Sequence, residues 1–534
     1  MDLAAVEEVI HLAQLSGDER KVAATRMLDT LRTTEDRWDI GLVREYLDSS
    51  VAVDTRKAIR EAMMEWIKNI IIIPETQANS KEIMPPRPPV YLINNVVSIV
   101  TLCVKHDFPE IWPSAFDEIL ELGNSCISGL DLTVRVLSDL DVEVVTSFSD
   151  GGTAASSAAP AENNSQATRR QKEEQMHNTA IKDAMRAGDI TRNIVHLLCK
   201  SAVYLRSDTA LHASRGTGTC NALSRRCLRC MSLFIGWIDV NLVISETLST
   251  LYQSLQDGVL CAPALACLYE LVKKGMDPLV KVYMINSIDI VPMLIRVPLG
   301  EIDPTEANFA DDEDEDRHVF ELGMTIDMIA LELIGVWSKY EELVLGDGKG
   351  APPKAPSTQD EAGRIHDVAP IAGRMLHSIV PLLIQVFGSD DSDIANTVLP
   401  ALGKLVGVLK IQKANSERLP SAMAAFIAAQ PSSASSSPKS GTNETAAVQD
   451  SVPYLQILDY FPSILGTIYR QIQYPADFEY DANDENDAEI MEVSVTGFAI
   501  YVCVYACICH VNVLCGCSAG GGCGHLRAPP LSES

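Results

Sequence analysis

The sequence of residues 130–145 is Leu-Asp-Leu-Thr-Val-Arg-Val-Leu-Ser-Asp-Leu-Asp-Val-Glu-Val-Val. Apolar residues that share one helical face in it are Leu132, Val136, Leu137 and Leu140. Residues three and four positions apart lie on the same side of an α-helix but would alternate between the two faces of a strand. The stretch therefore predicts an amphipathic helix that packs against its neighbours through one apolar stripe.

Helical periodicity extends outward from this stretch in both directions. Apolar segments of helix length occupy residues 56–73 and 91–104, and pairs of helices of roughly 15 residues follow over 220–300. We find no strand–helix alternation in the sequence. Helical pairs recurring about every 40 residues, without a strict motif, are typical of HEAT and armadillo solenoids. We therefore predict an all-α fold, a HEAT/ARM-type helical-repeat solenoid.

Further helices are expected where the apolar periodicity resumes, at residues 169–205, 319–345, 368–387, 392–410 and 452–473. Breaks between helices are expected near Asp239, Asp257-Gly258 and Gly275–Pro278, because Asp, Gly and Pro are common at helix boundaries. Composition gives the domain organisation. We predict HEAT repeats at 1–148, a flexible Gly/Ser/Ala-rich linker at 149–168, further repeats at 169–473 with loops at 301–318, 346–362 and 430–450, an acidic loop at 474–492 and an atypical Cys-rich tail at 493–534.

The net charge of the 534-residue chain is −29. Such a chain repels nucleic acid on average, because affinity for phosphate is largely electrostatic, although a local basic groove remains compatible with it. A partner with a basic surface also fits this charge. The start of the chain has no signal-peptide pattern, and eight of the 14 cysteines are scattered, as is common for buried free thiols in a reducing compartment.

The other six cysteines lie in the tail, for which three interpretations are open. Residues 495–516 are apolar over about the length that crosses a bilayer, but His510, Asn512 and the lack of a flanking basic cluster argue against a membrane anchor. Its Cys and His residues match no common metal module. The tail is also explained by translation into an unspliced intron, because Val493-Ser494 can be encoded by GTGAGT, a typical splice donor. We favour this third interpretation and expect no membrane or metal site.

Several segments, in their order along the chain, resemble the exportin-T family of the importin-β superfamily. They are Ile111–Phe116, Leu130–Leu137, Asn178–Arg186, Trp237–Ile244, Lys274–Pro278 and Tyr474–Asp481, and the resemblance covers about residues 90–492. The linker at 149–168 is longer than in the family, and residues 171–177 separate Arg169-Arg170 from Asn178. The family continues for roughly as many residues again, so this chain resembles its N-terminal half.

The resemblance implies a nuclear export receptor that binds tRNA together with Ran in its GTP form. It also implies contacts with nucleoporins, shuttling between nucleus and cytoplasm, a monomer, no cofactor and no catalysis. The N-terminal repeats would hold Ran. Because the family clamps tRNA with both halves of its superhelix, we expect this chain to bind tRNA weakly or not at all. A helical-repeat scaffold for protein partners and a tail-anchored adaptor remain alternatives.

Two sets of charged residues are candidate contacts under this resemblance. Candidate tRNA contacts are Arg169, Arg170, Lys172, Lys182, Arg186 and Arg192, which would neutralise phosphates without reading sequence. The alternative is a solvated helix in which Glu173, Glu174 and Asp183 balance these charges. Candidate Ran contacts are Asp477, Glu479, Asp481, Asp484 and Glu485, with a second acidic run at 311–316; both runs also fit simple solubilising loops.

The Cys-x-x-Cys spacing in Arg225-Arg226-Cys227-Leu228-Arg229-Cys230 resembles half of a metal site, but no second half follows. We expect a helix with one basic face there. Asn94, Asn95, Trp112 and Trp237 are expected to pack or cap helices. The sequence shows no phosphate-binding loop, nucleophile elbow or catalytic histidine arrangement, so we predict no enzyme.

Overall fold

The computed structural model describes residues 90–144, 164–299, 317–345, 359–414 and 460–471, together with nine positions between 57 and 69. The chain divides into two compact units. Unit 1 comprises Met1–Lys274 and Ile302–Asp312, and unit 2 comprises Gly275–Glu301 and Glu313–Ser534. Regular structure in the described ranges is helical, without strands. The predicted all-α, HEAT-type fold is confirmed.

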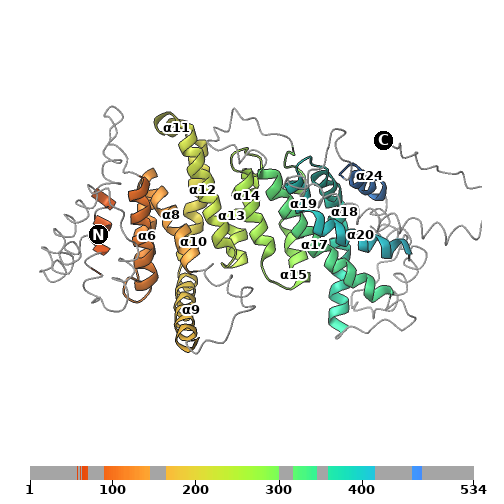
Figure 1. Ribbon diagram of the computed structural model, residues 1–534, viewed down its shortest axis with the longest axis horizontal. Helices are drawn as coiled ribbons and strands as arrows, with labels where there is room; N and C mark the ends of the chain where they lie inside the picture. Colours follow the sequence, from red (N-terminus) through yellow and green to blue (C-terminus); the bar gives the residue numbers. More distant parts are fainter. Residues whose placement is uncertain are drawn as a thin grey trace, which may run out of the picture. The chain divides into compact units, whose positions relative to one another are not determined.

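The contacts between the helices of unit 1 define two rows, and Figure 1 shows helices of unit 1 following one another along the chain. The first row holds α6 (Val90–Asp107), α8 (Ile127–Val144), α12 (Thr217–Ile235) and α14 (Cys261–Lys273). The second row holds α7 (Ala115–Ser125), α10 (Ile190–Ser207) and α13 (Val240–Ser254). Each helix contacts its row neighbour, and α7 with α8, α10 with α12 and α13 with α14 form antiparallel pairs of the HEAT kind. Two further helices, α9 (Asn164–Ala187) and α11 (Thr209–Arg215), flank α10.

The helix expected from the opening stretch is α8, and its four apolar residues are all buried. Trp112 is also buried, and its Nε1 donates a hydrogen bond to Glu118 Oε1 at 3.0 Å, so its expected packing role is confirmed. Burying one aliphatic side chain contributes about 1.5–3 kcal/mol. The stripe of α8 therefore accounts for much of the attraction between α8 and its neighbours.

Single aspartates set the expected breaks between helices. Asp239 Oδ1 accepts hydrogen bonds from the backbone N–H groups of Asn241 and Leu242 at 2.8 and 3.3 Å, and α13 begins there. Asp277 caps α15 (Pro278–Ser287) in the same way, and Asp257 accepts from two backbone N–H groups in the turn before α14. These bonds satisfy donors that have no partner inside a helix. The three predicted breaks are confirmed.

Unit 2 centres on two 29-residue helices, α17 (Arg317–Leu345) and α18 (Gln359–Phe387), which pack along each other. Within the described part of unit 2, the other helices are α15, α16 (Ile290–Leu294), α19 (Ser392–Thr397), α20 (Leu399–Ala414) and α24 (Phe461–Gln471). Residues 363–387 are long and apolar enough to span a bilayer, but 56% of that window is buried inside the protein. We interpret their apolar character as core packing against α17.

Several expected boundaries differ from the structure. The helix expected at 169–205 breaks at Gly188-Asp189 into α9 and α10, and the helix expected at 392–410 breaks at Val398 into α19 and α20. Glycine costs helix stability, and Pro400 suits the first turn of a new helix. The linker at 149–168 and the loops at 301–318 and 346–362 are shorter than expected, because helices begin at Asn164, Arg317 and Gln359. The loop at 430–450, the acidic loop at 474–492 and the tail at 493–534 lie outside the described residues.

Helices α17 and α19 approach each other closely at Gly323. A Cβ atom there would overlap the side-chain oxygen of Thr397 and come within 3.3 Å of Val386 Cγ1. We expect Gly323→Ala to destabilise unit 2 by about 1–3 kcal/mol, because overpacking forces the helices apart. Thermal unfolding followed by circular dichroism measures the expected fall in Tm.

Gly335, on the same helix, provides the matched control. It is exposed, and nothing lies within 4 Å of an added Cβ. Gly335→Ala should therefore leave Tm unchanged or raise it, because alanine favours the helix by roughly 0.5–1 kcal/mol. Equal Tm values for the two variants would contradict the close approach at Gly323.

Candidate nucleic-acid interface

Helix α9 carries most of the predicted tRNA contacts and is anchored to α6 and α8 by polar groups. Asn178 is buried, and its Nδ2 donates to the Glu143 backbone oxygen at 3.3 Å. Lys105 Nζ lies 2.8 Å from Glu174 Oε1 and 3.0 Å from Glu143 Oε2. Burial lowers the pKa of Lys105, but hydrogen bonds and charge from these two glutamates raise it above its usual value overall. Glu174 thus holds α9 in place through Lys105.

The structure does not gather the six predicted basic residues into one site. Arg169 and Arg170 lie on α9, with side chains outside the described part of the structure. Lys172 is exposed near the start of α9, about 15 Å along the helix axis from Lys182 at 1.5 Å per residue. Arg186 follows one turn after Lys182.

Arg186 meets Lys274, a residue that the sequence did not single out, at the turn after α12. Arg186 Nη2 donates to the Trp237 backbone oxygen at 2.9 Å, and its guanidinium lies 5.4 Å from the centre of the Trp237 ring. Lys274 Nζ donates to the Ile238 backbone oxygen at 2.7 Å. Basic groups at these oxygens suit the carboxyl end of a helix. The packing role expected for Trp237 agrees with these contacts.

The electrostatics of this turn show that its cations are close together. Burial lowers the pKa of Lys182, and the positive charge of Arg186 lowers it further. Burial likewise lowers the pKa of Lys274, with Arg186 again contributing. The structure therefore brings Lys182, Arg186 and Lys274 together and leaves Lys172 apart.

Arg192, the last predicted tRNA contact, lies on α10 beside two carboxylates. Its Nη1 is 3.3 Å from Asp189 Oδ1, and its Nε is 3.6 Å from Glu246 Oε1. Asp183 similarly lies 3.2 Å from Arg186 Nη1. Asp189, Glu246 and Asp183 therefore balance part of the positive charge of the predicted tRNA contacts. This agrees with the alternative interpretation, in which the helix is solvated and carries balanced charges.

The basic cluster at 225–230 lies on α12, and the expected helix with one basic face is confirmed. Cys227 and Cys230 are buried in the first row. Burial raises the pKa of Cys230 to about 12, and it raises the pKa of Cys227 as well. Arg225 and Arg226 are partly exposed and Arg229 is exposed on the opposite side of the helix. The thiols therefore pack in the core while the arginines face outward.

A ladder of polar contacts links three helices of the first row on this outward side. Arg226 Nη1 of α12 is paired with Asp131 Oδ1 of α8. Asp131 Oδ2 also lies 3.1 Å from Arg135 Nε. Arg135 Nη1 donates in turn to Asn94 Oδ1 of α6 at 3.0 Å. The Asp131 carboxylate thus holds two guanidinium groups, those of Arg226 and Arg135.

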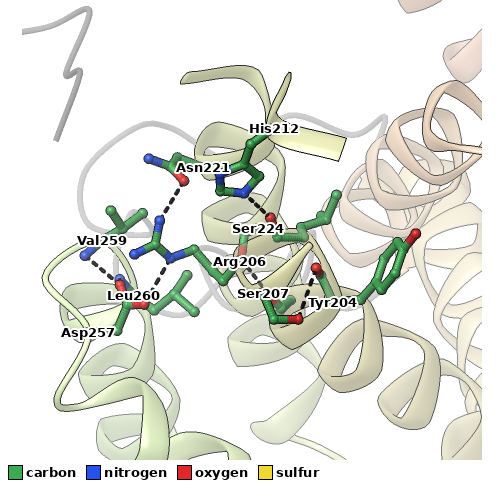
Figure 2. A network of polar contacts seen from close by, with 11 residues as sticks. Tyr204, Arg206, Ser207, His212, Asn221, Ser224, Asp257, Val259 and Leu260 are labelled. Carbon is green, nitrogen blue, oxygen red and sulfur yellow. Dashed lines mark hydrogen bonds and ion pairs between the residues drawn. The ribbon is translucent and has the colours of Figure 1, made fainter. Parts of the chain in front are cut away.

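A second network, shown in Figure 2, holds α12 along α10. Arg206 of α10 lies between Asn221 of α12 and Asp257, with contacts of 2.7 and 2.8 Å. Ser224 Oγ donates to the Ala202 backbone oxygen at 2.7 Å. Because these groups are partly or fully buried, they fix how α12 presents its outward side.

The candidate Ran contacts Asp477, Glu479, Asp481, Asp484 and Glu485, and the acidic run 311–316, lie outside the described residues. Within the described residues, no group of three or more His, Cys, Asp or Glu side chains is placed to hold a metal ion.

Comparison with known proteins shows what the helices of unit 1 resemble. Residues 89–268 match the model of the "Exportin 1-like protein" family, from the start of α6 into α14. The chain is 24% identical to exportin-T of Danio rerio over 388 residues, which is 70% of this chain and 32% of the relative. It is 23% identical to exportin-T of Mus musculus over 393 residues, with the same coverage. The chain is similar to exportin-T.

The resemblance to exportin-T inferred from the sequence is confirmed by these matches. A shorter match to exportin-T of Arabidopsis thaliana reaches 26% identity over 209 residues, 38% of this chain and 18% of the relative. The chain spans about a third of the length of the Danio rerio and Mus musculus proteins. The α9 segment and the arginines of α12 both lie inside the region that matches the family model.

The burial of Cys227 and Cys230 gives a chemical test of the α12 orientation. A buried thiol with a raised pKa is neither accessible nor ionised at pH 8. We expect iodoacetamide to modify the half-buried Cys126 in the native protein and to leave Cys227 and Cys230 unmodified until the protein is denatured. Peptide mass spectrometry measures each site separately. If Cys227 and Cys230 are modified as fast as Cys126, they are not buried. If they are modified only after a chelator is added, a metal ion and not core packing protects them.

Proposed function

We propose that this chain acts as a nuclear export receptor that binds tRNA together with Ran in its GTP form. The proposal rests on the match to exportin-T along 70% of the chain, combined with paired helices of the HEAT kind in the matched region. A transport receptor needs binding surfaces and no catalytic group. The chain would shuttle between nucleus and cytoplasm, with cargo loaded where RanGTP is abundant.

Basic residues on the helical repeats would carry the RNA contact. The proposed contacts on α9 and α10 are Arg169, Arg170, Lys172, Lys182, Arg186 and Arg192. Lysine and arginine bind phosphate oxygens without identifying bases, and duplex RNA is recognised mainly by shape, phosphates and 2′-hydroxyl groups. This mode suits a receptor that accepts many tRNAs with one shared shape.

Acidic residues would carry the Ran contact. The proposed contacts are Asp477, Glu479, Asp481, Asp484 and Glu485. A strongly negative chain attracts a partner with a basic surface and speeds the encounter at low ionic strength. If RanGTP and tRNA favour the same arrangement of the repeats, each raises the affinity for the other by the same factor.

Retention of Ran on the immobilised full chain tests this proposal. We expect Ran locked in its GTP form to be retained more strongly than Ran–GDP, and added tRNA to increase that retention. In the reciprocal measurement, RanGTP should raise the affinity for labelled tRNA by the same factor in filter binding at low salt. Absolute tRNA affinity should remain weak.

A variant with Asp477→Asn and Glu479→Gln provides the control for the acidic contact and should reduce retention of RanGTP at low salt. If the unmodified chain retains Ran–GTP and Ran–GDP equally, and added tRNA does not change that retention, the result would contradict the export function. That result would favour a helical-repeat scaffold for other proteins.

A further inference from the structure

Two carboxyl groups of α17 contact α20, one near each end of α20. Asp327 Oδ1 accepts a hydrogen bond from the backbone N–H of Ala401, in the first turn of α20, at 2.8 Å. Glu341 Oε1 accepts one from Gln412 Nε2, in the last turn of α20, at 2.6 Å. Both helices pass these contacts in the same order along the chain, so α20 runs parallel to α17 between them.

The contact between Glu341 and Gln412 is closed to solvent. The two residues are 2% and 0% exposed. Trp337 Nε1 also donates to Glu341 Oε1, at 2.8 Å, so both donors reach the same oxygen. Among the described residues, Glu341 Oε2 and Gln412 Oε1 are buried without a hydrogen-bond partner. Leaving two buried acceptors without a donor is unfavourable.

A single proton on Glu341 would explain this arrangement. In a carboxylic acid the carbonyl oxygen only accepts, whereas the hydroxyl oxygen carries a donor. Glu341 Oε1, which receives two hydrogen bonds, has the environment of the carbonyl oxygen, and Oε2 has that of the hydroxyl. An O–H at Oε2 can donate to Gln412 Oε1. The acid and the amide would then exchange two hydrogen bonds, and both acceptors would be satisfied.

The charges around the two carboxyl groups differ. Burial raises the pKa of Glu341 to about 6, against the hydrogen bonds from Gln412 and Trp337, and no charged side chain contributes. Burial also raises the pKa of Asp327 to about 6, but there Lys404 of α20 favours the carboxylate. Of the other helices packed against α17, α15 places Lys281 2.6 Å from Glu332, α18 places His366 beside Tyr340 with ring centres 6.2 Å apart, and α19 uses Asp391 to cap its own first turn.

We propose that Glu341 is a protonated carboxylic acid in folded unit 2 in mildly acidic solution, and that its two hydrogen bonds with Gln412 form a pH-sensitive latch that holds the end of α20 on α17. When Glu341 releases its proton to solvent, Gln412 Oε1 loses its donor and a buried negative charge remains. The latch therefore weakens at neutral and higher pH. This inference concerns unit 2 alone and does not depend on the proposed export function.

The direction of the pH dependence follows from the two ends of the titration. The pKa of Glu341 is about 6 in the folded protein and has a usual value of 4.5, so the folded state binds the proton more tightly than the unfolded state. The stability that the latch contributes is complete below about pH 4.5 and is lost as the pH rises through about 6.

Glu341→Gln in the full chain tests the latch. An amide at this position is uncharged at every pH, and it keeps an acceptor oxygen and supplies an N–H donor for Gln412 Oε1. The variant should therefore have a higher Tm than the unmodified chain, and the difference should grow by about 2–5 °C between pH 5 and pH 8. Differential scanning calorimetry at several pH values measures it. A contribution from His366 is common to both proteins and cancels in the difference.

Glu342→Gln is the matched control, because it removes the same charge from the next residue, which is exposed. Its Tm should follow that of the unmodified chain at every pH. Hydrogen exchange followed by mass spectrometry gives a local readout. After correction for the intrinsic exchange rate, amides of residues 405–414 should lose protection between pH 5 and pH 8 in the unmodified chain and keep it in Glu341→Gln.

Two results would overturn the inference. One is a Tm difference between Glu341→Gln and the unmodified chain that stays constant with pH, or a variant that is less stable at pH 8, because the carboxylate would then be the form that holds α20. The other is protection of residues 405–414 that does not change with pH in the unmodified chain. This second measurement decides the question even if Glu341→Gln does not fold. Neither measurement uses RNA or Ran, so the result is independent of the proposed function.

Discussion

Helix α12 must pack against α8, α10 and α14 at once, and the organisation of unit 1 depends on that packing. Its buried side contacts α10 across the two rows and α8 and α14 along the first row. Cys220, Cys227 and Cys230 behave here as small apolar groups that let the helices approach. Because core residues occupy the buried side of α12, its arginines can lie only on the side that faces outward. The basic surface is therefore a consequence of how the core is filled.

In unit 2, buried polar groups fix how the helices pack against one another. Glu341 Oε1 of α17 accepts hydrogen bonds from Trp337 Nε1 at 2.8 Å and from Gln412 Nε2 of α20 at 2.6 Å. Asp327 Oδ1 accepts from the backbone N–H of Ala401 at 2.8 Å. Burial raises the pKa of both carboxyl groups to about 6. Burying a carboxylate is unfavourable unless its hydrogen bonds are made, so these contacts specify where α20 lies against α17.

Features set by neighbouring residues were predictable from the sequence, and features set by distant contacts were not. Asp239 and Asp277 cap helices through backbone groups two and three residues away, so the breaks could be located from the sequence alone. The outward stripe of α12 was predicted for the same reason, because buried and exposed positions follow the helical period. Lys274 and Arg186 meet only because α9 and α14 both end near the turn after α12. The pairing of Asp131 with Arg226 joins residues 95 positions apart, and no local pattern encodes it.

The comparison of α9 with α12 shows why the number of basic residues is a poor guide to a phosphate-binding surface. Arg186 and Lys274 donate to backbone oxygens of Trp237 and Ile238, and Arg192 lies between two carboxylates. Burial lowers the pKa of Lys182, and the positive charge of Arg186 lowers it further. Charges beyond about 8–10 Å are largely screened at physiological salt, so the charges next to a basic residue matter more than the net charge of the chain. Helix α12 contains no acidic residue, yet its Arg226 is paired with Asp131 of α8. The charge around a basic residue is therefore set by its neighbours in space and not by its own helix.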